Sequence, residues 1–113
     1  MTGRDLARKI VGRHNVHLSA HSDRYDPLCQ RVYLTIGTMM GTNCEALMTA
    51  AHECVHRLQH VRGERMGPRW FTPLRVWREW RAWIEAYRLA RPYLPEPDQG
   101  DARAMKWRAF SYL

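Results

Sequence analysis

The feature that most constrains this chain is the stretch 51–56, Ala-His-Glu-Cys-Val-His, which contains the pattern His-Glu-x-x-His. In an α-helix, residues four positions apart lie one turn above each other, so His52 and His56 can offer two imidazoles to one metal ion. Glu53 projects about 100° away from His52, close enough to handle a water molecule without being a ligand itself. Whether the pattern has this meaning depends on two conditions: a helical context and a third ligand.

The residues around the pattern favour a helix. Thr42 and Glu45 have the spacing of a capping box, and Gly63 suits the left-handed position that ends many helices. We therefore predict a central helix from about Asn43 to Arg62. One face of this helix is apolar, and we expect it to be buried while the histidine face lines a cleft. The apolar face consists of Leu47, Ala50, Ala51, Cys54, Leu58 and Val61, and the opposite face also carries Met48, Thr49, Val55 and Gln59.

Shorter elements precede the central helix. Thr2 and Asp5 form a second possible capping box, which predicts a short helix to about Gly12. The segments 16–18 and 31–36 are rich in β-branched and aromatic residues, and Tyr25-Asp26-Pro27 between them has turn composition. We predict that the two segments form a small antiparallel pair beside the cleft.

The third ligand is predicted on a helix that follows. Thr72-Pro73 begins it, because proline fits the first helical position, and Pro92 ends it after Arg91. Glu79 projects from the apolar side of this helix, where a carboxylate is costly unless it is paired. Small alanines at positions 82 and 86 allow close approach to the central helix. Glu79 is therefore our candidate, and a His₂Glu set would result. Pairing of Glu79 with an arginine is the plain alternative, and Glu85 is the second candidate.

The length, charge and cysteine content of the chain predict its domain number, partners and location. With 113 residues, the chain is expected to form a single domain, 1–113. Lys and Arg total 18 against 11 acids, a net charge of +7, which favours acidic partners such as nucleic acid. No run is long and apolar enough for a membrane span or a signal peptide, so no membrane contact is expected. Three cysteines without a paired pattern indicate free thiols and a cytoplasmic location.

The sequence resembles the neutral zinc metallopeptidases of the YugP type. Residues 23–27, Asp-Arg-Tyr-Asp-Pro, are similar to the family's Asp-His-Tyr-Asp-Pro, and residues 31–35 resemble the strand that follows it. Residues 50–59, Ala-Ala-His-Glu-Cys-Val-His-Arg-Leu-Gln, resemble Ala-Ala-His-Glu-Val-Gly-His-Ala-Ile-Gln. Residues 79–82 resemble the family's Glu-Phe-Asp-Ala. The resemblance implies a short, soluble relative of the gluzincin type, with Glu79 as the third ligand.

These observations predict a mainly helical α+β fold, a minimal zincin-like domain in which a second ligand-bearing helix packs on the central helix. The predicted function is zinc-dependent hydrolysis of peptide or protein substrates, with Zn²⁺ on His52, His56 and Glu79 and with Glu53 as general base. An oxyanion donor or substrate contact is also expected. Its candidates are Tyr25, Tyr33, Tyr87 and His60. The alternatives are a basic nucleic-acid-binding module that acts through the Arg-rich surface, and a zinc-binding regulatory relative without turnover.

Overall fold

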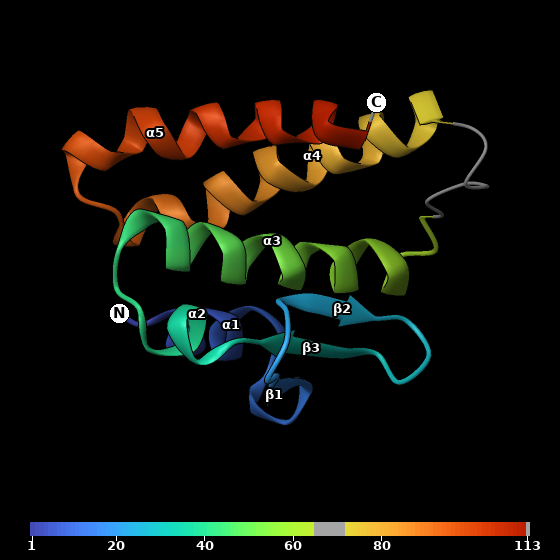
Figure 1. Ribbon diagram of the computed structural model, residues 1–113, viewed down its shortest axis with the longest axis horizontal. Helices are drawn as coiled ribbons and strands as arrows, with labels where there is room; N and C mark the ends of the chain where they lie inside the picture. The colour runs from blue at the N-terminus through green and yellow to red at the C-terminus, as the bar shows by residue number, and fades with distance from the viewer. Residues whose placement is uncertain (65–71, 113) are drawn as a thin grey trace.

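The structure is a computed structural model that describes residues 1–64 and 72–112. Helix α3 (Cys44–Val61) lies in the middle, between two layers (Figure 1). One layer contains α4 (Thr72–Ala90), η2 (Arg91–Tyr93), η3 (Glu96–Asp98), α5 (Gln99–Ala104) and η4 (Met105–Tyr112). The other contains α1 (Gly3–Val11), η1 (Arg13–Asn15), α2 (Ile36–Met40) and the strands β1 (Val16–Leu18), β2 (Arg24–Asp26) and β3 (Arg31–Leu34). The predicted mainly helical α+β fold is confirmed.

The residues that begin and end α3 have the cap interactions expected from local sequence, but the N-cap residue differs from the predicted one. The side chain of Asn43 accepts a hydrogen bond from Ala46 N at 2.9 Å, so Asn43 is the N-cap, and the predicted capping box beginning at Thr42 is wrong. Asparagine is among the best N-cap residues and lies one position closer to the first turn. At the other end, Gly63 has φ +83°, as predicted. Its N–H bonds to His60 O while Glu64 N bonds to Gln59 O, which is a Schellman motif.

Helix α3 is covered on both sides, which differs from the prediction of one buried face and one open face. Ala50 and Cys54 pack toward α1 and the sheet in one cluster that includes Val32. Met48 and Val55, on the predicted open face, are fully buried in a second cluster with residues of α4. Periodicity cannot reveal this second layer, because alanines and methionine suit either environment. The histidines therefore lie at a packed helix–helix interface.

The sheet corrects the predicted strand pairing. Its order is β1-β3-β2, with β1 parallel and β2 antiparallel to β3. The predicted antiparallel pairing of 16–18 with 31–36 is thus wrong, because an unpredicted third strand intervenes in the chain. The turn begins at Asp26, whose Oδ1 accepts a hydrogen bond from Leu28 N at 2.9 Å, and this leaves Tyr25 inside β2. Strand β3 ends at Leu34, so residue 36 belongs to α2 instead.

The predictions for α1 and α4 are confirmed to within one residue. The Thr2 side chain accepts from Asp5 N, and Asp5 accepts from Thr2 N, which completes the predicted capping box. Helix α4 ends at Ala90. Ala82 and Ala86 are fully buried against α3, and their small side chains let the two helices approach closely.

Candidate metal centre

His52, His56 and Glu79 come together between α3 and α4. One ligand atom from each of the three lies within 4.8 Å of the others. Glu79 Oε2 is 2.8 Å from His52 Nε2, and Glu79 Oε1 is 2.8 Å from His56 Nε2. Atoms that bind one zinc ion lie at most about 4.2 Å apart, so only a small side-chain movement is needed for the three to share an ion.

The positions of these side chains follow from helix geometry. His52 and His56 are four residues apart on α3 and so project from successive turns of one face. Glu79 lies on the face of α4 that carries Ala82 and Ala86, and only 2% of its surface is exposed. A carboxylate at this depth requires compensation, which the two imidazoles supply.

The electrostatics of the cluster indicate a need for positive charge. Burial alone would lower the pKa of His52, but Glu53 and Glu79 outweigh it and raise that pKa to about 9. Burial alone would raise the pKa of Glu79, but its contacts with His52 and His56 lower it to about 2. Both shifts favour the state with a carboxylate and a cationic partner. A metal ion provides such a partner.

Gln59 orients the ring of His56. The Gln59 side-chain Nε2 donates to Arg78 O at 3.4 Å, so its Oε1 faces His56 Nδ1 at 3.3 Å and accepts a hydrogen from it. With a hydrogen on Nδ1, the neutral ring directs the lone pair of Nε2 toward the Glu79 carboxylate. Two lone pairs at 2.8 Å repel each other unless a proton or a metal ion lies between them. The donor set therefore fits a bound cation.

Trp83 fixes the other imidazole. Its ring stacks on that of His52 with centroids 3.9 Å apart and planes 7° apart. It lies one turn after Glu79 on α4 and is nearly fully buried. The stacking restricts rotation of His52 and keeps water from that face of the ring. We did not predict a contact with the site for either Trp83 or Gln59. Their helical spacing from Glu79 and His56 was the available signal.

Replacing Gln59 with leucine is expected to weaken zinc binding by about 10–100-fold, because His56 loses the acceptor that fixes its tautomer. Gln99→Leu, on α5 and remote from the cluster, is the matched control and should bind as the wild type does. Competition with a chromophoric chelator measures both affinities. Unchanged affinity in Gln59→Leu would show that Gln59 does not orient His56.

Glu53 lies beside the cluster but outside it. Its Oε1 is 3.4 Å from His52 Nδ1, and its side chain is 13% exposed. The Glu53 carboxylate thus lies next to the three candidate ligands and remains accessible to solvent. A group that exchanges protons with water needs this access.

The remaining candidates occupy different places. Tyr25 Oη and His60 Nδ1 form a hydrogen bond of 2.7 Å. Tyr33 packs against His17 and beneath Arg24, on the other face of the sheet from α3. Tyr87 packs against the cluster of α1, α3 and α4 that contains Leu6. Glu85, the second candidate for third ligand, pairs at the surface with Arg62.

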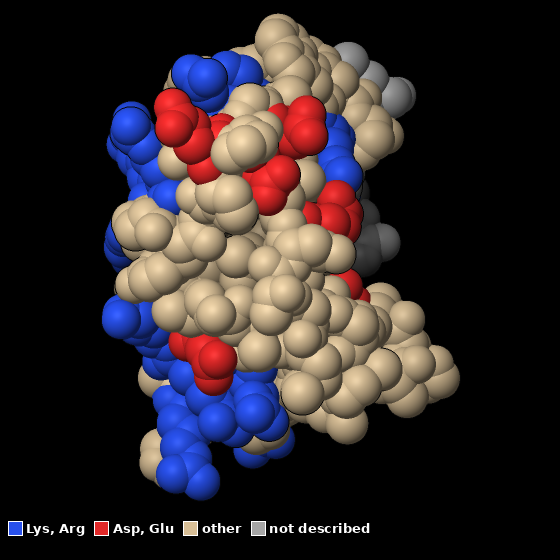
Figure 2. Space-filling view, turned by 90° about the vertical axis from the view of Figure 1, so that its left-hand side faces the viewer, with Lys and Arg blue, Asp and Glu red and all other residues tan. Residues whose placement is uncertain are grey.

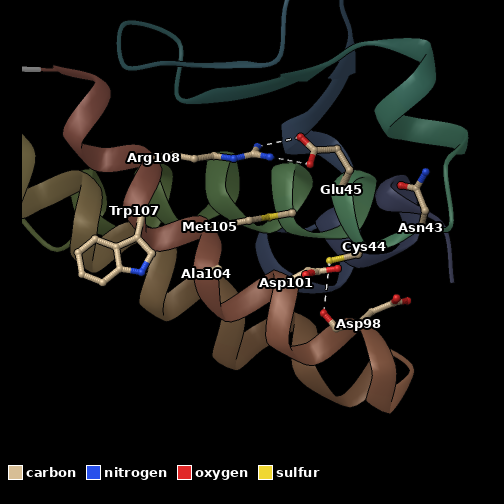
Figure 3. A pocket seen from close by; sticks show the side chains of 9 residues that line it. All are labelled: Asn43, Cys44, Glu45, Asp98, Asp101, Ala104, Met105, Trp107 and Arg108. Carbon is tan, nitrogen blue, oxygen red and sulfur yellow. Dashed lines mark hydrogen bonds and ion pairs between the residues drawn. The ribbon is translucent and has the colours of Figure 1, made fainter.

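A hollow of about 760 Å³ lies at the N-terminal end of α3 (Figure 3). Cys44, Glu45 and Asp101 line it, and Arg108 binds both oxygens of Glu45 at 2.8 Å. It shares no residue with the His52, His56 and Glu79 cluster. The predicted chemistry therefore does not belong to this hollow.

Charge is unevenly distributed on the surface. Lys and Arg gather along one edge of the face in Figure 2, whereas most of the Asp and Glu seen there lie in its upper half. Several arginines are paired within the described residues, among them Arg62 with Glu85 and Arg78 with Glu64. A basic edge of this kind attracts anions in general.

Comparison with known protein families matches residues 1–69 to the family described as "Putative neutral zinc metallopeptidase". The chain belongs to this family. The match includes His52, Glu53 and His56 and ends before Glu79, so the geometry of α4 supports Glu79 independently of the family match. No curated protein and no solved structure matches the chain. Within the described residues of this metallopeptidase-family chain, no helix has the length and apolar character to cross a bilayer.

Proposed function

We propose that this protein hydrolyses peptide bonds with a zinc ion held by His52, His56 and Glu79. The observation that carries the proposal is the convergence of these three side chains at a buried interface, with Glu53 beside them. Two imidazoles and one carboxylate are the protein ligands of many catalytic zinc sites, which keep a coordination position open. The family name supports the same chemistry.

When bound, zinc supplies a Lewis acid that acidifies water and polarises a carbonyl group. Glu53 accepts a proton from the water that attacks the scissile carbonyl carbon. A C–O bond forms, and the π electron pair moves to the carbonyl oxygen. The oxyanion pair then re-forms the C=O bond while the C–N bond breaks. The C–N electron pair stays on the amine nitrogen, to which Glu53 returns the proton. Gln59 and Trp83 hold the two imidazoles in place throughout.

The edge available to an extended peptide is that of β2. Strand β3 cannot take this role, because it is paired on both sides, by β1 and β2. Strand β2 contacts α3 and, among the described strands, pairs on one side only. A substrate backbone that adds to β2 would run close to α3, the helix that carries the histidines (Figure 1).

The purified protein is expected to contain about one zinc ion per chain and to cleave an unfolded protein such as casein. Removing the metal with 1,10-phenanthroline should abolish cleavage, and added zinc should restore it. Metal analysis and the appearance of new amino termini measure the two results. Cleavage that persists without the metal would contradict the proposal.

The two alternatives predict other results. A regulatory relative would bind zinc but leave every peptide substrate intact. A nucleic-acid-binding module would bind DNA or RNA with steep salt dependence, and chelation would not change that binding. The charge of +7 is compatible with this last hypothesis, which stays a prediction.

A further inference from the structure

Tyr25 is directed at α3 by the register of the sheet. Tyr25 pairs with Val32, and directly opposed residues project from the same face. Val32 is fully buried in the cluster that includes Ala50 and Cys54 of α3. Tyr25 therefore faces the helix, and its Oη reaches His60 Nδ1 at 2.7 Å. The phenol is held in place at both ends, by packing at the ring and by a hydrogen bond at the hydroxyl.

His60 lies on the same side of α3 as the proposed active site. It follows His56 by one turn. Viewed down the axis of α3, His60 projects about 80° from His52, and Glu53 projects about 100° from His52 in the same direction of rotation. Side chains of a helix lean toward its N-terminus, so His60 leans toward the turn of His56. Exposure increases along this row, from buried His52 through half-buried His56 to exposed His60. The hydroxyl of Tyr25 thus meets this row of side chains at its exposed end, at His60.

The other tyrosine candidates lack this position. Tyr33 neighbours Val32 on β3 and so projects from the opposite face, where Arg24 covers its ring at 4.5 Å. Tyr87 lies two turns beyond Glu79 on α4, and it packs against the buried cluster that contains Leu6. Of the four candidates, Tyr25 and His60 are the two that contact each other, and His60 lies one helical turn after His56.

We infer that Tyr25 is a catalytic residue whose hydroxyl donates a hydrogen bond to the carbonyl oxygen during hydrolysis, and that His60 is the residue that positions it. This inference rests on the proposed peptidase function. Such a donor contributes most when it is fixed in advance, at the place where negative charge develops. The hydrogen bond between Tyr25 and His60 fixes the hydroxyl before substrate arrives.

The direction of that hydrogen bond determines what Tyr25 can do. If His60 donates through Nδ1–H, the phenolic oxygen accepts, and the hydrogen of the phenol remains free for the substrate. As water attacks, the carbonyl π pair moves to the carbonyl oxygen. The resulting oxyanion accepts this hydrogen bond without proton transfer. Burial raises the pKa of Tyr25, with a smaller opposing effect of Arg57, so the hydroxyl stays protonated at neutral pH.

The test compares Tyr25→Phe with Tyr33→Phe as the matched control. Tyr25→Phe is expected to lower kcat by about 10²–10³-fold with little change in KM, because it removes a contact made in the transition state. Tyr33→Phe should leave both parameters unchanged. Zinc content should equal that of the wild type in both variants, since neither tyrosine belongs to the ligand cluster.

A binding measurement gives a readout that does not depend on turnover. A phosphinic peptide carries an oxygen where the oxyanion forms, and calorimetry should show that Tyr25→Phe binds it at least about tenfold more weakly. The amine product of cleavage, which has no oxygen at that place, should bind both proteins equally. His60→Asn, whose amide can donate from the place of Nδ1, should retain more activity than His60→Leu.

The outcomes separate this inference from the proposed function. An active wild type whose Tyr25→Phe variant has unchanged kcat and unchanged affinity for the phosphinic peptide overturns the inference alone. Equal losses in His60→Asn and His60→Leu overturn the positioning role of His60. A wild type that binds zinc but cleaves no peptide removes the proposed function, and the inference with it.

Discussion

Zinc binding is expected to be lost when Glu79 is replaced by glutamine. It is expected to persist when Glu85 is replaced in the same way. Glutamine has the shape of glutamate, but it lacks the charge that compensates a buried dication. Glu79 Oε1 and Oε2 each lie 2.8 Å from a histidine nitrogen, so the change acts on the whole cluster. Loss of a ligand should lower the zinc affinity by more than about 10–100-fold. That smaller decrease is the one expected when an outer hydrogen-bond partner such as Gln59 is lost.

Glu85→Gln is the matched control on the same helix. Its carboxylate pairs with Arg62 at the surface, and such a pair contributes at most about 1 kcal/mol to stability. Glu85→Gln should therefore fold, and circular dichroism checks that Glu79→Gln does so as well. Competition titration with a chromophoric chelator then gives the two zinc affinities. Wild-type affinity in Glu79→Gln, together with lost affinity in His52→Ala, would show that another group is the third ligand.

The helices that carry this cluster could be predicted because their signals are local. The spacing of His52 and His56, the left-handed glycine at 63 and the proline at 73 each depend on a few neighbouring residues. Glu79 could be predicted to face the interior because its neighbours on that face of α4 are apolar, and Glu79 is buried in the structure. The family resemblance stated for the sequence agrees with the matched family.

The order of the strands depends on distant contacts and could not be predicted in the same way. Tyr25-Asp26-Pro27 has turn composition, yet the turn begins only at Asp26, and this difference of one residue hid β2. With β2 unrecognised, an antiparallel hairpin was the simplest arrangement for the two remaining strands. The Tyr25–His60 contact depends on this missing strand. Sequence reasoning therefore named both residues but could not choose between them and Tyr33 or Tyr87.

Burial of α3 on both sides was missed for a related reason. The face that carries the histidines also carries Met48 and Val55, which are completely buried against α4. A helix between two layers has apolar residues nearly all round, and a few polar functional groups on it do not reveal the second layer. The burial has a chemical consequence, because a low-dielectric interface strengthens every charge interaction among His52, His56 and Glu79.

Replacing Glu53 with glutamine is expected to lower kcat/KM for peptide hydrolysis by about 10²–10⁴-fold while zinc stays bound. Glutamine keeps the size of the side chain beside His52 Nδ1, but it cannot accept a proton from water. Because Glu53 lies outside the ligand cluster, its charge is not required to hold the metal. This separation of activity from metal content distinguishes a general base from a ligand.

Glu45→Gln is the matched control for Glu53, since it lies on the same helix and pairs with Arg108 at the far end from His56. It should retain both zinc and activity. Initial rates on a fluorogenic peptide and metal content of the same samples measure the two quantities together. If Glu53→Gln cleaves the peptide at the wild-type rate, Glu53 is not the base. If it loses its zinc as well as its activity, Glu53 contributes to metal binding, and the assignment of three ligands must change. The expected result, full zinc content without turnover, assigns metal binding to His52, His56 and Glu79 and proton transfer to Glu53.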